Sequence, residues 1–584
     1  MLKPPADAYD FKPVKGARIE MTVDGRTTVL KGAKTADGRT DDDALWPTHR
    51  VNFGCIGGIE ATMTAFSPFD NKDYDNMSLP YAFYEISMAN SGDRDAKVSL
   101  RFVFPEDVKT WAVASDCTGE KTIRKGGTAT ARFVVAWYDH TDPELAHYKN
   151  LYASPQPIAK RGLEVFPQLK HNAMRLDDGM RRSSLPHWLQ NQVANTLSAI
   201  VINSMYKRDG RVAFAEGQWT CFGTNAHVLF NCRGIHIPSH FYTHGLDCQF
   251  DKTWPMTFWV AGAPWYSMFY WDYYLYTRDR EFLRRRALPF MEEAVAFFED
   301  FLTEGADGKY IVNPSYSPEN HPKNYKMQAC INATMDIAAI KAMLRAVIEA
   351  SRTLGANSDR IPAWQAMLDK MPAYGNNADG EFREWLWADM EDNHEHRHAS
   401  HLIGLYDLHD PEIMQSRELR QGALKAIDRR MDFRRKENTG VMAFGICQLA
   451  FSAAALGQAD RCEEMLGWLG DNYFLDNMFS THDPHNIFNC DISGGYPSLV
   501  MKMLCYSEPG RIDIFPAKPS SWRRGSIKGM ALRGGIIMVE LRWDGSKTTV
   551  TLRADDTQEV SVTIYGKHVK NVRLKKGKPT TLAL

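Results

Sequence analysis

Hydrophobic and polar residues alternate along the first part of the chain, up to about residue 165. Short runs rich in β-branched and aromatic residues are separated by turn sequences such as Asp24-Gly25 and Gly126-Gly127. Regularly spaced strands and turns of this kind are typical of a β-sandwich. The expected strands cover residues 18–23, 59–65, 81–89, 97–104 and 128–137.

The pattern changes near residue 185, where apolar residues begin to recur at helical spacing. Residues 254–276 are apolar nearly all round, as in a buried helix, whereas residues 281–302 carry charged positions, as in a covering helix. This alternation continues to about residue 507 and predicts a double ring of helices, with the inner ring shielded by the outer. The other expected helices cover residues 185–206, 335–354, 417–430, 441–456 and 460–469.

The end of the chain returns to the alternating pattern of strands, with turns at Gly534-Gly535 and Asp544-Gly545-Ser546. We therefore predict a multidomain α+β protein. It would have an N-terminal β-sandwich and linker over residues 1–180, a helical domain over 181–507 and a small C-terminal β-sandwich over 508–584. The C-terminal strands are expected at residues 511–515, 527–532, 535–543, 548–553 and 559–565.

Charge and composition narrow the classes of partner. The chain has 70 basic and 71 acidic side chains, so it has no excess positive charge for nucleic acid. No run of about eighteen apolar residues predicts a membrane span, and the first residues show no apolar run typical of a signal peptide. The ten scattered cysteines neither require nor exclude an oxidising compartment, so the localisation stays open. The sequence also leaves the oligomeric state open. Aromatic residues reach 11%, which suits either a large core or a cleft that binds sugar rings.

Two carboxylates have the setting that glycosidic bond cleavage requires, since that reaction uses one carboxyl group on each side of the bond. Glu319 lies in the loop 313–320, between two expected helices. Asp491 precedes the sequence Ser493-Gly494-Gly495. Each also has a purely structural interpretation, because Glu319 could cap a helix and Asp491 could occupy a turn.

Histidine gathers in two further places. Residues 394–401 hold four histidines, but they lack the H-E-x-x-H spacing of a zinc enzyme. His236, His240 and His244 share a helical spacing near three cysteines, yet this arrangement matches no common zinc pattern. We therefore expect no metal and no cofactor, and a sugar pocket is the favoured interpretation of residues 394–401.

Four segments then resemble glycoside hydrolase family 95, in the order of that family. They are residues 314–320 (Pro-Ser-Tyr-Ser-Pro-Glu-Asn), 333–336 (Ala-Thr-Met-Asp), 396–406 (His-Arg-His-Ala-Ser-His-Leu-Ile-Gly-Leu-Tyr) and 482–491. Known members include inverting α-L-fucosidases and α-L-galactosidases with a β-domain, an (α/α)6 barrel and a second β-domain. The resemblance implies an (α/α)6 barrel here, Glu319 as the general acid and Asp491 as the carboxylate on the side of the water.

The sequence departs from the family on the water side. The family places its Asp in Ile-Asp-Gly-Asn-Phe-Gly, whereas here Asp491 is followed by Ile-Ser-Gly-Gly. The family motif Asn-x-Asn-x-x-Met-Asn-Tyr-Trp, which holds the water, is absent, and Asn225 or His227 could replace it. The residues expected to line the sugar pocket are Glu216, Trp219, Asn225, His227, Asn320, His396, Arg397, His398, His401 and His482.

Residues from about 60 to 235 resemble the N-terminal part of glycoside hydrolase family 116, a family of retaining β-glucosidases and their relatives. Residues 185–189 (Leu-Pro-His-Trp-Leu) and 209–217 (Asp-Gly-Arg-Val-Ala-Phe-Ala-Glu-Gly) carry this resemblance, which implies Glu216 as a nucleophile.

We therefore predict an inverting glycosidase that removes a terminal sugar from an oligo- or polysaccharide. The alternatives are a retaining β-glycosidase, a glycoside phosphorylase with Arg397 as a phosphate ligand, and a carbohydrate-binding protein of the same fold.

Overall fold

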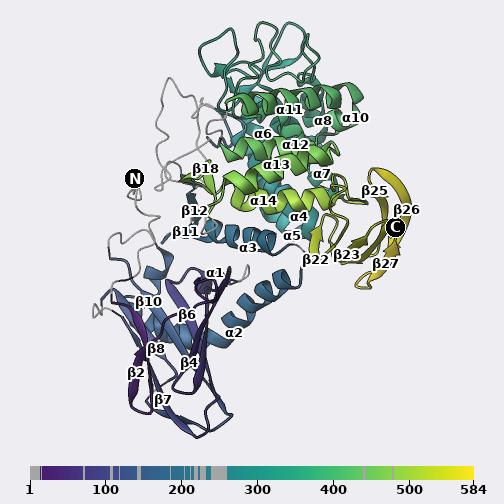
Figure 1. Ribbon diagram of the computed structural model, residues 1–584. Helices are drawn as coiled ribbons and strands as arrows, with labels where there is room; N and C mark the ends of the chain where they lie inside the picture. Colours follow the sequence, from purple (N-terminus) through teal and green to yellow (C-terminus); the bar gives the residue numbers. More distant parts are fainter. Residues whose placement is uncertain are drawn as a thin grey trace. The chain divides into compact units, whose positions relative to one another are not determined.

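The structure is a computed structural model, and it forms two compact units, Leu2–Phe214 and Ala215–Leu584 (Figure 1). Among the described residues, no helix combines the length and the hydrophobicity needed to span a bilayer. The structure describes residues 14, 16–69, 73–104, 109–117, 119–140, 146–184, 186–202, 204–208, 210, 212–215, 221–223, 232–238, 259–437, 442–475 and 479–584.

The N-terminal unit contains two antiparallel sheets that share one hydrophobic core. The strand orders are β2-β1-β7-β9 and β3-β4-β5-β6-β10-β8. Inward-facing residues of both sheets, among them Met21, Ile86, Val98 and Phe133, are buried together. The strands are β1 (Arg18–Val23), β2 (Arg26–Val29), β3 (Asp42–Leu45), β4 (Thr48–Ile56), β5 (Ile59–Phe66), β6 (Tyr81–Asn90), β7 (Ala96–Val103), β8 (Trp111–Ser115), β9 (Lys121–Ile123) and β10 (Thr128–Trp137).

Helix α2 (Pro155–Arg181) covers the outer face of the larger sheet, where Phe166 packs against Phe66 and Phe83. The expected β character up to residue 165 is therefore wrong at its end. Gly162 and Pro167 hide the helical pattern of this segment. Helix α3 (His187–Ile202) follows, and the Asn195 side chain accepts a hydrogen bond from the Trp46 backbone at 2.8 Å.

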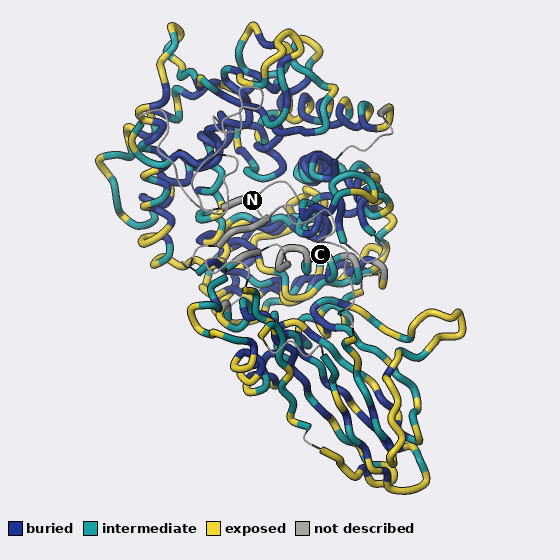
Figure 2. Tube along the Cα trace, turned by 90° about the vertical axis from the view of Figure 1, so that its left-hand side faces the viewer, coloured by how far each residue is buried: buried dark blue, intermediate teal, exposed yellow. Residues whose placement is uncertain are grey.

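The second unit is built from alternating inner and outer helices. The inner helices pack on one another in chain order, and the outer helices cover them. The inner helices are α4 (Gly262–Thr277), α7 (Thr334–Leu354), α9 (Ile403–Tyr406), α12 (Ala443–Ala455) and α14 (Asp491–Leu504). The outer helices are α6 (Leu288–Phe301), α8 (Ile361–Lys370), α11 (Arg417–Glu437) and α13 (Ala459–Asn472). Helices α7 and α12 are almost entirely buried, as Figure 2 shows for much of the helical interior.

Two helices differ from the sequence interpretation. Helix α14 was not expected, because Gly494, Gly495 and Pro497 interrupt its pattern. A side chain at Gly495 would meet the Cys447 sulfur at 2.9 Å, so glycine allows α12 and α14 to approach closely. Helix α4 was expected to be buried on all sides, but three of its aromatic side chains are exposed, namely Phe269, Tyr273 and Tyr276.

The end of the chain forms two four-stranded sheets, with orders β20-β21-β25-β26 and β22-β23-β24-β27. Arg533, which follows β22, bonds Asp272 of α4 at 2.9 and 3.0 Å, and this contact fastens the sheets to the helices. The strands are β20 (Cys505–Glu508), β21 (Arg511–Ile514), β22 (Arg524–Leu532), β23 (Ile536–Asp544), β24 (Lys547–Ala554), β25 (Gln558–Ile564), β26 (Lys567–Leu574) and β27 (Thr580–Ala583). The domain limits at residues 180 and 507 stay predictions.

Candidate active site

The loop that carries Glu319 is anchored to the start of α7. The Ser315 hydroxyl and the Tyr316 backbone N–H both donate to one oxygen of Asp336, at 2.6 and 2.9 Å. Asp336 lies in the first turn of α7 and is fully buried. Burial raises the pKa of its carboxyl group to about 7. The start of the loop therefore has a fixed position relative to the inner helix.

A buried carboxylate, Glu384, holds the loop on both sides of Glu319. It accepts hydrogen bonds from the Ser317 hydroxyl at 2.7 Å and from the Asn320 amide at 2.9 Å. Arg430 of α11 donates to the same carboxylate at 2.5 Å. Burial raises the pKa of Glu384, although the Arg430 charge acts in the opposite direction. Loop residues 317 and 320 are thus fixed by a network that is itself buried.

Asn320, a predicted sugar ligand, is fully buried within this network. Its second amide hydrogen is donated to the Asn393 carbonyl at 3.0 Å, and its oxygen accepts from the His321 backbone and the Asn393 side chain. Because all its polar atoms are bonded inside the protein, its geometry suits a residue that positions the loop.

The Glu319 side chain is 18% exposed, in contrast to its buried neighbours, and forms an ion pair with Arg397. The Arg397 side chain is 41% exposed. The Glu319 carbonyl accepts a hydrogen bond from the Gln328 amide at 2.9 Å. A rigid loop therefore presents one carboxylate beside a half-exposed guanidinium.

The histidine-rich segment is bonded to the peptide that precedes Glu319. The carbonyl of Pro318 lies 3.2 Å from Nδ1 of His398 and accepts a hydrogen bond from the Ser400 hydroxyl. Arg434 of α11 donates to the Arg397 carbonyl. The bonds to Pro318 bring His398 and Ser400 directly against the loop.

The predicted histidines of this segment are uncharged at neutral pH. Burial, helped by the Arg397 charge, lowers the pKa of His398 to about 3. Burial also lowers the pKa values of His396 and His401, and Arg430 contributes to both. His398 and His401 are buried, and the two ring nitrogens of His398 face the Pro318 carbonyl and the Met442 sulfur, so the geometry suits residues that support the loop. His401 lies deeper, 3.9 Å from Glu384.

Asp491 is the first residue of α14, and its backbone N–H donates to the Asn489 side chain at 2.6 Å. It faces Cys447 of α12, whose thiol pKa is raised by burial and then by the Asp491 charge. His482 lies in β18 (Thr481–Asp483), 2.9 Å from the Asp483 carboxylate. It is close enough to His398 to add to the lowering of the His398 pKa, after burial, Arg397 and Arg434. The segment before α14 therefore approaches the histidine-rich segment.

Several predicted residues lie outside the described part of the chain. They are Glu216, Trp219, Asn225 and His227, so the rival nucleophile and the proposed water-holding residues remain predictions. His240 and His244 also lie outside it. His236 is described, and its ring is buried 2.9 Å from the Trp259 carbonyl.

Glu384, Arg430 and Arg434 were not found from the sequence. Glu384 belongs to none of the four motifs, and a lone carboxylate gives no sign of its partner. Arg430 and Arg434 are spaced by four residues on α11, on the same face as the buried Ala426, Ile427 and Met431. Charged residues on the apolar face of a helix are a signal of buried ion pairs, and this signal was available in the sequence.

Family models match most of the chain. Residues 214–504 match the glycosyl hydrolase family 95 catalytic domain, and residues 506–582 match the family 95 C-terminal domain. Residues 28–153 match the N-terminal region of "beta-glucosidase 2, glycosyl-hydrolase family 116". Both family resemblances are confirmed, but the family 116 match ends at residue 153 and does not include the segments 185–189 and 209–217 on which that resemblance was based.

Two curated relatives of this chain are also named as glycosidases. "Alpha-L-fucosidase 2" of Arabidopsis thaliana is 32% identical over 374 residues, which cover 61% of this chain and 40% of the relative. "Probable alpha-fucosidase A" of Aspergillus niger is 25% identical over 335 residues, or 52% of this chain and 41% of the relative. The chain thus spans about two fifths of the length of these relatives.

A solved structure shares the fold. It is "Putative kojibiose phosphorylase from human microbiome", with a TM-score of 0.53 and 9% identity, covering 97% of this chain and 88% of that one. At this identity the likeness concerns the fold alone. The family models by themselves support one conclusion: the chain belongs to the glycoside hydrolases, and the catalytic and C-terminal domains of family 95 follow an N-terminal region of the family 116 type in the sequence.

Proposed function

We propose that this chain is an inverting glycosidase that removes a terminal sugar from an oligo- or polysaccharide. The observation that carries the proposal is the contrast around Glu319. Ser317 and Asn320 are bonded to the buried Glu384, whereas the Glu319 side chain is partly exposed. A protein that fixes a loop this firmly and leaves one carboxylate accessible has a site suited to acid catalysis.

In the proposed reaction Glu319 donates its proton to the glycosidic oxygen as the bond from that oxygen to the sugar breaks. A water molecule attacks the anomeric carbon from the opposite face, and Asp491 accepts the proton that the water loses. The anomeric configuration is therefore inverted. The two carboxyl groups of such enzymes lie roughly 6.5–9.5 Å apart, which leaves room for the water.

Arg397 has a specific part in this proposal. Its guanidinium forms an ion pair with the Glu319 carboxylate, so the acid has to exchange this partner before it bonds the substrate oxygen. A planar guanidinium can transfer its N–H groups to sugar hydroxyls. We infer that substrate binding redirects Arg397 to the sugar and releases Glu319 toward the glycosidic oxygen.

An α-L-fucoside is the first substrate to test, because the curated relatives are named as fucosidases. The residues after Asp491 differ from those of the family, so related sugars belong in the same panel: α-L-galactosides, β-glucosides and α-glucosides. Proton NMR of an aryl α-L-fucoside during turnover tests the mechanism. Inversion gives β-L-fucose first, and initial release of the α-anomer would overturn the proposal.

A glycoside phosphorylase is the second candidate, and the half-exposed Arg397 beside Glu319 favours it. In that reaction inorganic phosphate replaces water as the nucleophile. Turnover that requires phosphate and releases a sugar 1-phosphate would establish this alternative, whereas equal rates with and without phosphate would exclude it.

A further inference from the structure

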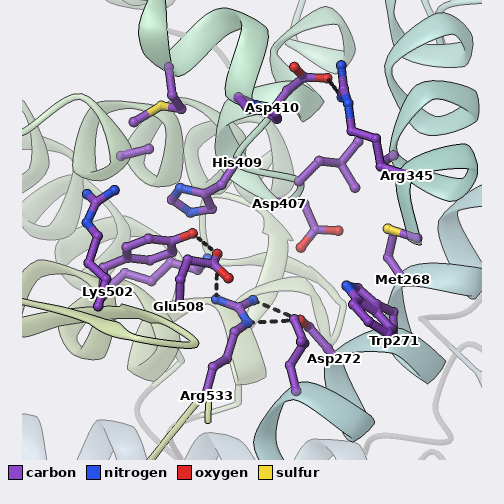
Figure 3. A pocket seen from close by; sticks show the side chains of 18 of the residues that line it. Met268, Trp271, Asp272, Arg345, Asp407, His409, Asp410, Lys502, Glu508 and Arg533 are labelled. Carbon is purple, nitrogen blue, oxygen red and sulfur yellow. Dashed lines mark hydrogen bonds and ion pairs between the residues drawn. The ribbon is translucent and has the colours of Figure 1, made fainter. Parts of the chain in front are cut away.

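A cavity lies within the Ala215–Leu584 unit, away from the candidate active site. It has a volume of about 630 Å³ and is bounded by α4, α7, the turn after α9, α12, α14 and the C-terminal strands β20 and β21 (Figure 3). Cavities of about 300–1,000 Å³ are the usual size for small-molecule sites. This one therefore has room for a ligand.

The cavity lies toward the far ends of the helices that begin at the candidate active site. Helix α14 starts at Asp491, whereas Lys502 of the same helix lines the cavity. Helix α7 starts beside the Glu319 loop, whereas Arg345 and Glu349 line the cavity. At about 1.5 Å per residue, Lys502 lies roughly 16 Å along the helix from Asp491. The two places are separate sites.

Most of the charged side chains of the cavity wall form ion pairs with one another. Arg533 bonds Asp272 at 2.9 and 3.0 Å and lies 3.7 Å from Glu508, and Arg345 bonds Asp410 at 2.7 Å (Figure 3). An anion or a cation would have to break these pairs, and removing one partner of a buried pair is costly. The wall is therefore suited to a ligand without net charge.

Lys502 and Asp407 are two further charged residues of the cavity wall. Burial lowers the pKa of Lys502, and burial raises the pKa of Asp407. Each group then counteracts part of this effect on the other. The indole N–H of Trp265 also donates to the Asp407 carboxylate. Asp407 is thus bonded within the wall, and the Lys502 ammonium lies 3.5 Å from the Tyr406 carbonyl.

The wall also offers aromatic faces. Phe269 of α4 lines the cavity and is 54% exposed, although it lies on a helix that is apolar nearly all round. Trp271, Phe451 and Tyr506 line the cavity as well, and Tyr506 stacks on His409 with 4.1 Å between ring centroids. Rings next to hydrogen-bonding groups suit a ligand with apolar C–H faces and many hydroxyls.

We propose that this cavity is a second binding site for a neutral saccharide. Each ion pair of the wall presents carboxylate acceptors and guanidinium donors side by side, and a sugar hydroxyl can donate to one and accept from the other. The exposed aromatic rings contact the C–H faces of the sugar. The site is distinct from the one that carries the proposed hydrolysis, and it does not depend on that function.

The test uses the full chain with Glu319→Gln, so that no probe is consumed, and the probes lactose, maltotriose and cellotriose. Isothermal titration and saturation-transfer NMR measure binding to this parent and to Phe269→Ala. The matched control is Tyr273→Ala, an exposed aromatic residue of the same helix that is not among the lining residues. We expect at least one probe to bind, its dissociation constant to rise at least tenfold in Phe269→Ala, and no change in the control.

Two further variants distinguish binding in the cavity from binding at the candidate active site and from loss of folding. Arg397→Ala should weaken binding at the candidate active site but leave the second class of sites intact. If Phe269→Ala lowers the melting temperature, Glu508→Gln replaces it, since this change keeps the shape of a wall residue. The proposal is overturned if no probe binds at 10 mM, if cavity variants bind like the parent, or if inorganic phosphate or glucuronate binds the cavity more tightly than the neutral probes.

Discussion

Arg397 forms an ion pair with Glu319, the group that the proposed mechanism requires as a proton donor. The pair joins the two most specific motifs of the sequence, since one residue comes from the Pro-Ser-Tyr-Ser-Pro-Glu-Asn loop and the other from the histidine-rich run. Because both side chains are partly exposed, the pair is accessible to a ligand, and the proposed mechanism has substrate separate the two groups.

Arg397→Met tests this relationship. We expect KM for an aryl glycoside to rise about tenfold or more, because a charge-assisted contact to the sugar is worth roughly 1.5–3 kcal/mol. The value of kcat should fall less. Steady-state kinetics give both constants, and an unchanged KM with a large loss of kcat would place Arg397 in the chemical step instead.

Glu319→Gln should reduce kcat by about 10²–10⁴ on substrates with poor leaving groups, the usual contribution of a general acid. Glycosyl fluorides should lose much less activity, because fluoride departs with little protonic assistance. The control is Glu395→Gln, an exposed carboxylate in the histidine-rich segment. Near-normal turnover of the poor substrates by the Glu319 variant would refute its role.

Glu384→Gln should lower the free energy of unfolding by about 3–5 kcal/mol, because Arg430 would be left as a buried charge without its partner. Urea denaturation measures this loss. Glu464→Gln removes an exposed ion pair with Arg435 and should cost at most about 1 kcal/mol. The double variant Glu384→Gln with Arg430→Met should recover part of the loss, and a strictly additive loss would contradict the proposed pairing.

Gly445→Ala should displace the arginines of the site. A β-carbon at this position would collide with the Arg397 carbonyl and the Arg434 guanidinium. We expect activity to fall at least tenfold together with stability. The control, Gly467→Ala on α13, meets nothing within 4 Å and should stabilise the protein by about 0.4–1 kcal/mol. Full activity of Gly445→Ala would show that Arg397 tolerates displacement.

His398 makes folding sensitive to acid. Its pKa is about 3 in the folded protein and about 6.5 when unfolded, so the unfolded state binds more protons between these values. Stability contributed by His398 is therefore complete above about pH 6.5 and is lost as the pH falls toward 3, by at most roughly 1.4 kcal/mol per pH unit.

The measurement compares the pH dependence of urea unfolding for the parent and His398→Gln between pH 4 and 7. The slope should decrease in the variant. Asp336, with its pKa raised to about 7, gives a slope of opposite sign in this range, so only the difference between the proteins isolates His398. His568→Gln, an exposed histidine of β26, should leave the slope unchanged. Equal slopes in all three proteins would contradict the buried neutral state.

The sequence predicted the strands of the N-terminal sheets well and the buried polar network poorly, for identifiable reasons. Strand β1 lies where the alternation placed it, because one of its faces is buried. Strand β10 lies where its apolar run placed it, and the second half of this strand is buried on both faces. Helices α2 and α14 escaped prediction, since glycine and proline inside them serve close packing and disguise the helical period. Glu384 and Arg430 escaped because they lie 46 positions apart, and their pairing depends on how α11 packs.

The motifs around Glu319 and Asp491 were readable because each is a continuous run of residues. Their surroundings were not, because Arg434 and Cys447 reach the site from helices that carry no motif. One sequence is enough to predict residues that lie in a continuous motif, but not the partners that only tertiary packing brings to them.

Three of the inner helices direct their amino ends, and so the positive ends of their dipoles, toward the candidate active site. Helix α7 begins beside the Glu319 loop, α12 begins near Arg397, and α14 begins at Asp491. The amino end of a helix carries roughly half a positive charge, and its carboxyl end carries the opposite. The macrodipoles therefore favour the carboxylate that Glu319 becomes after it gives up its proton. At the other ends of these helices the same macrodipoles favour cations, which is where Lys502 and Arg533 lie.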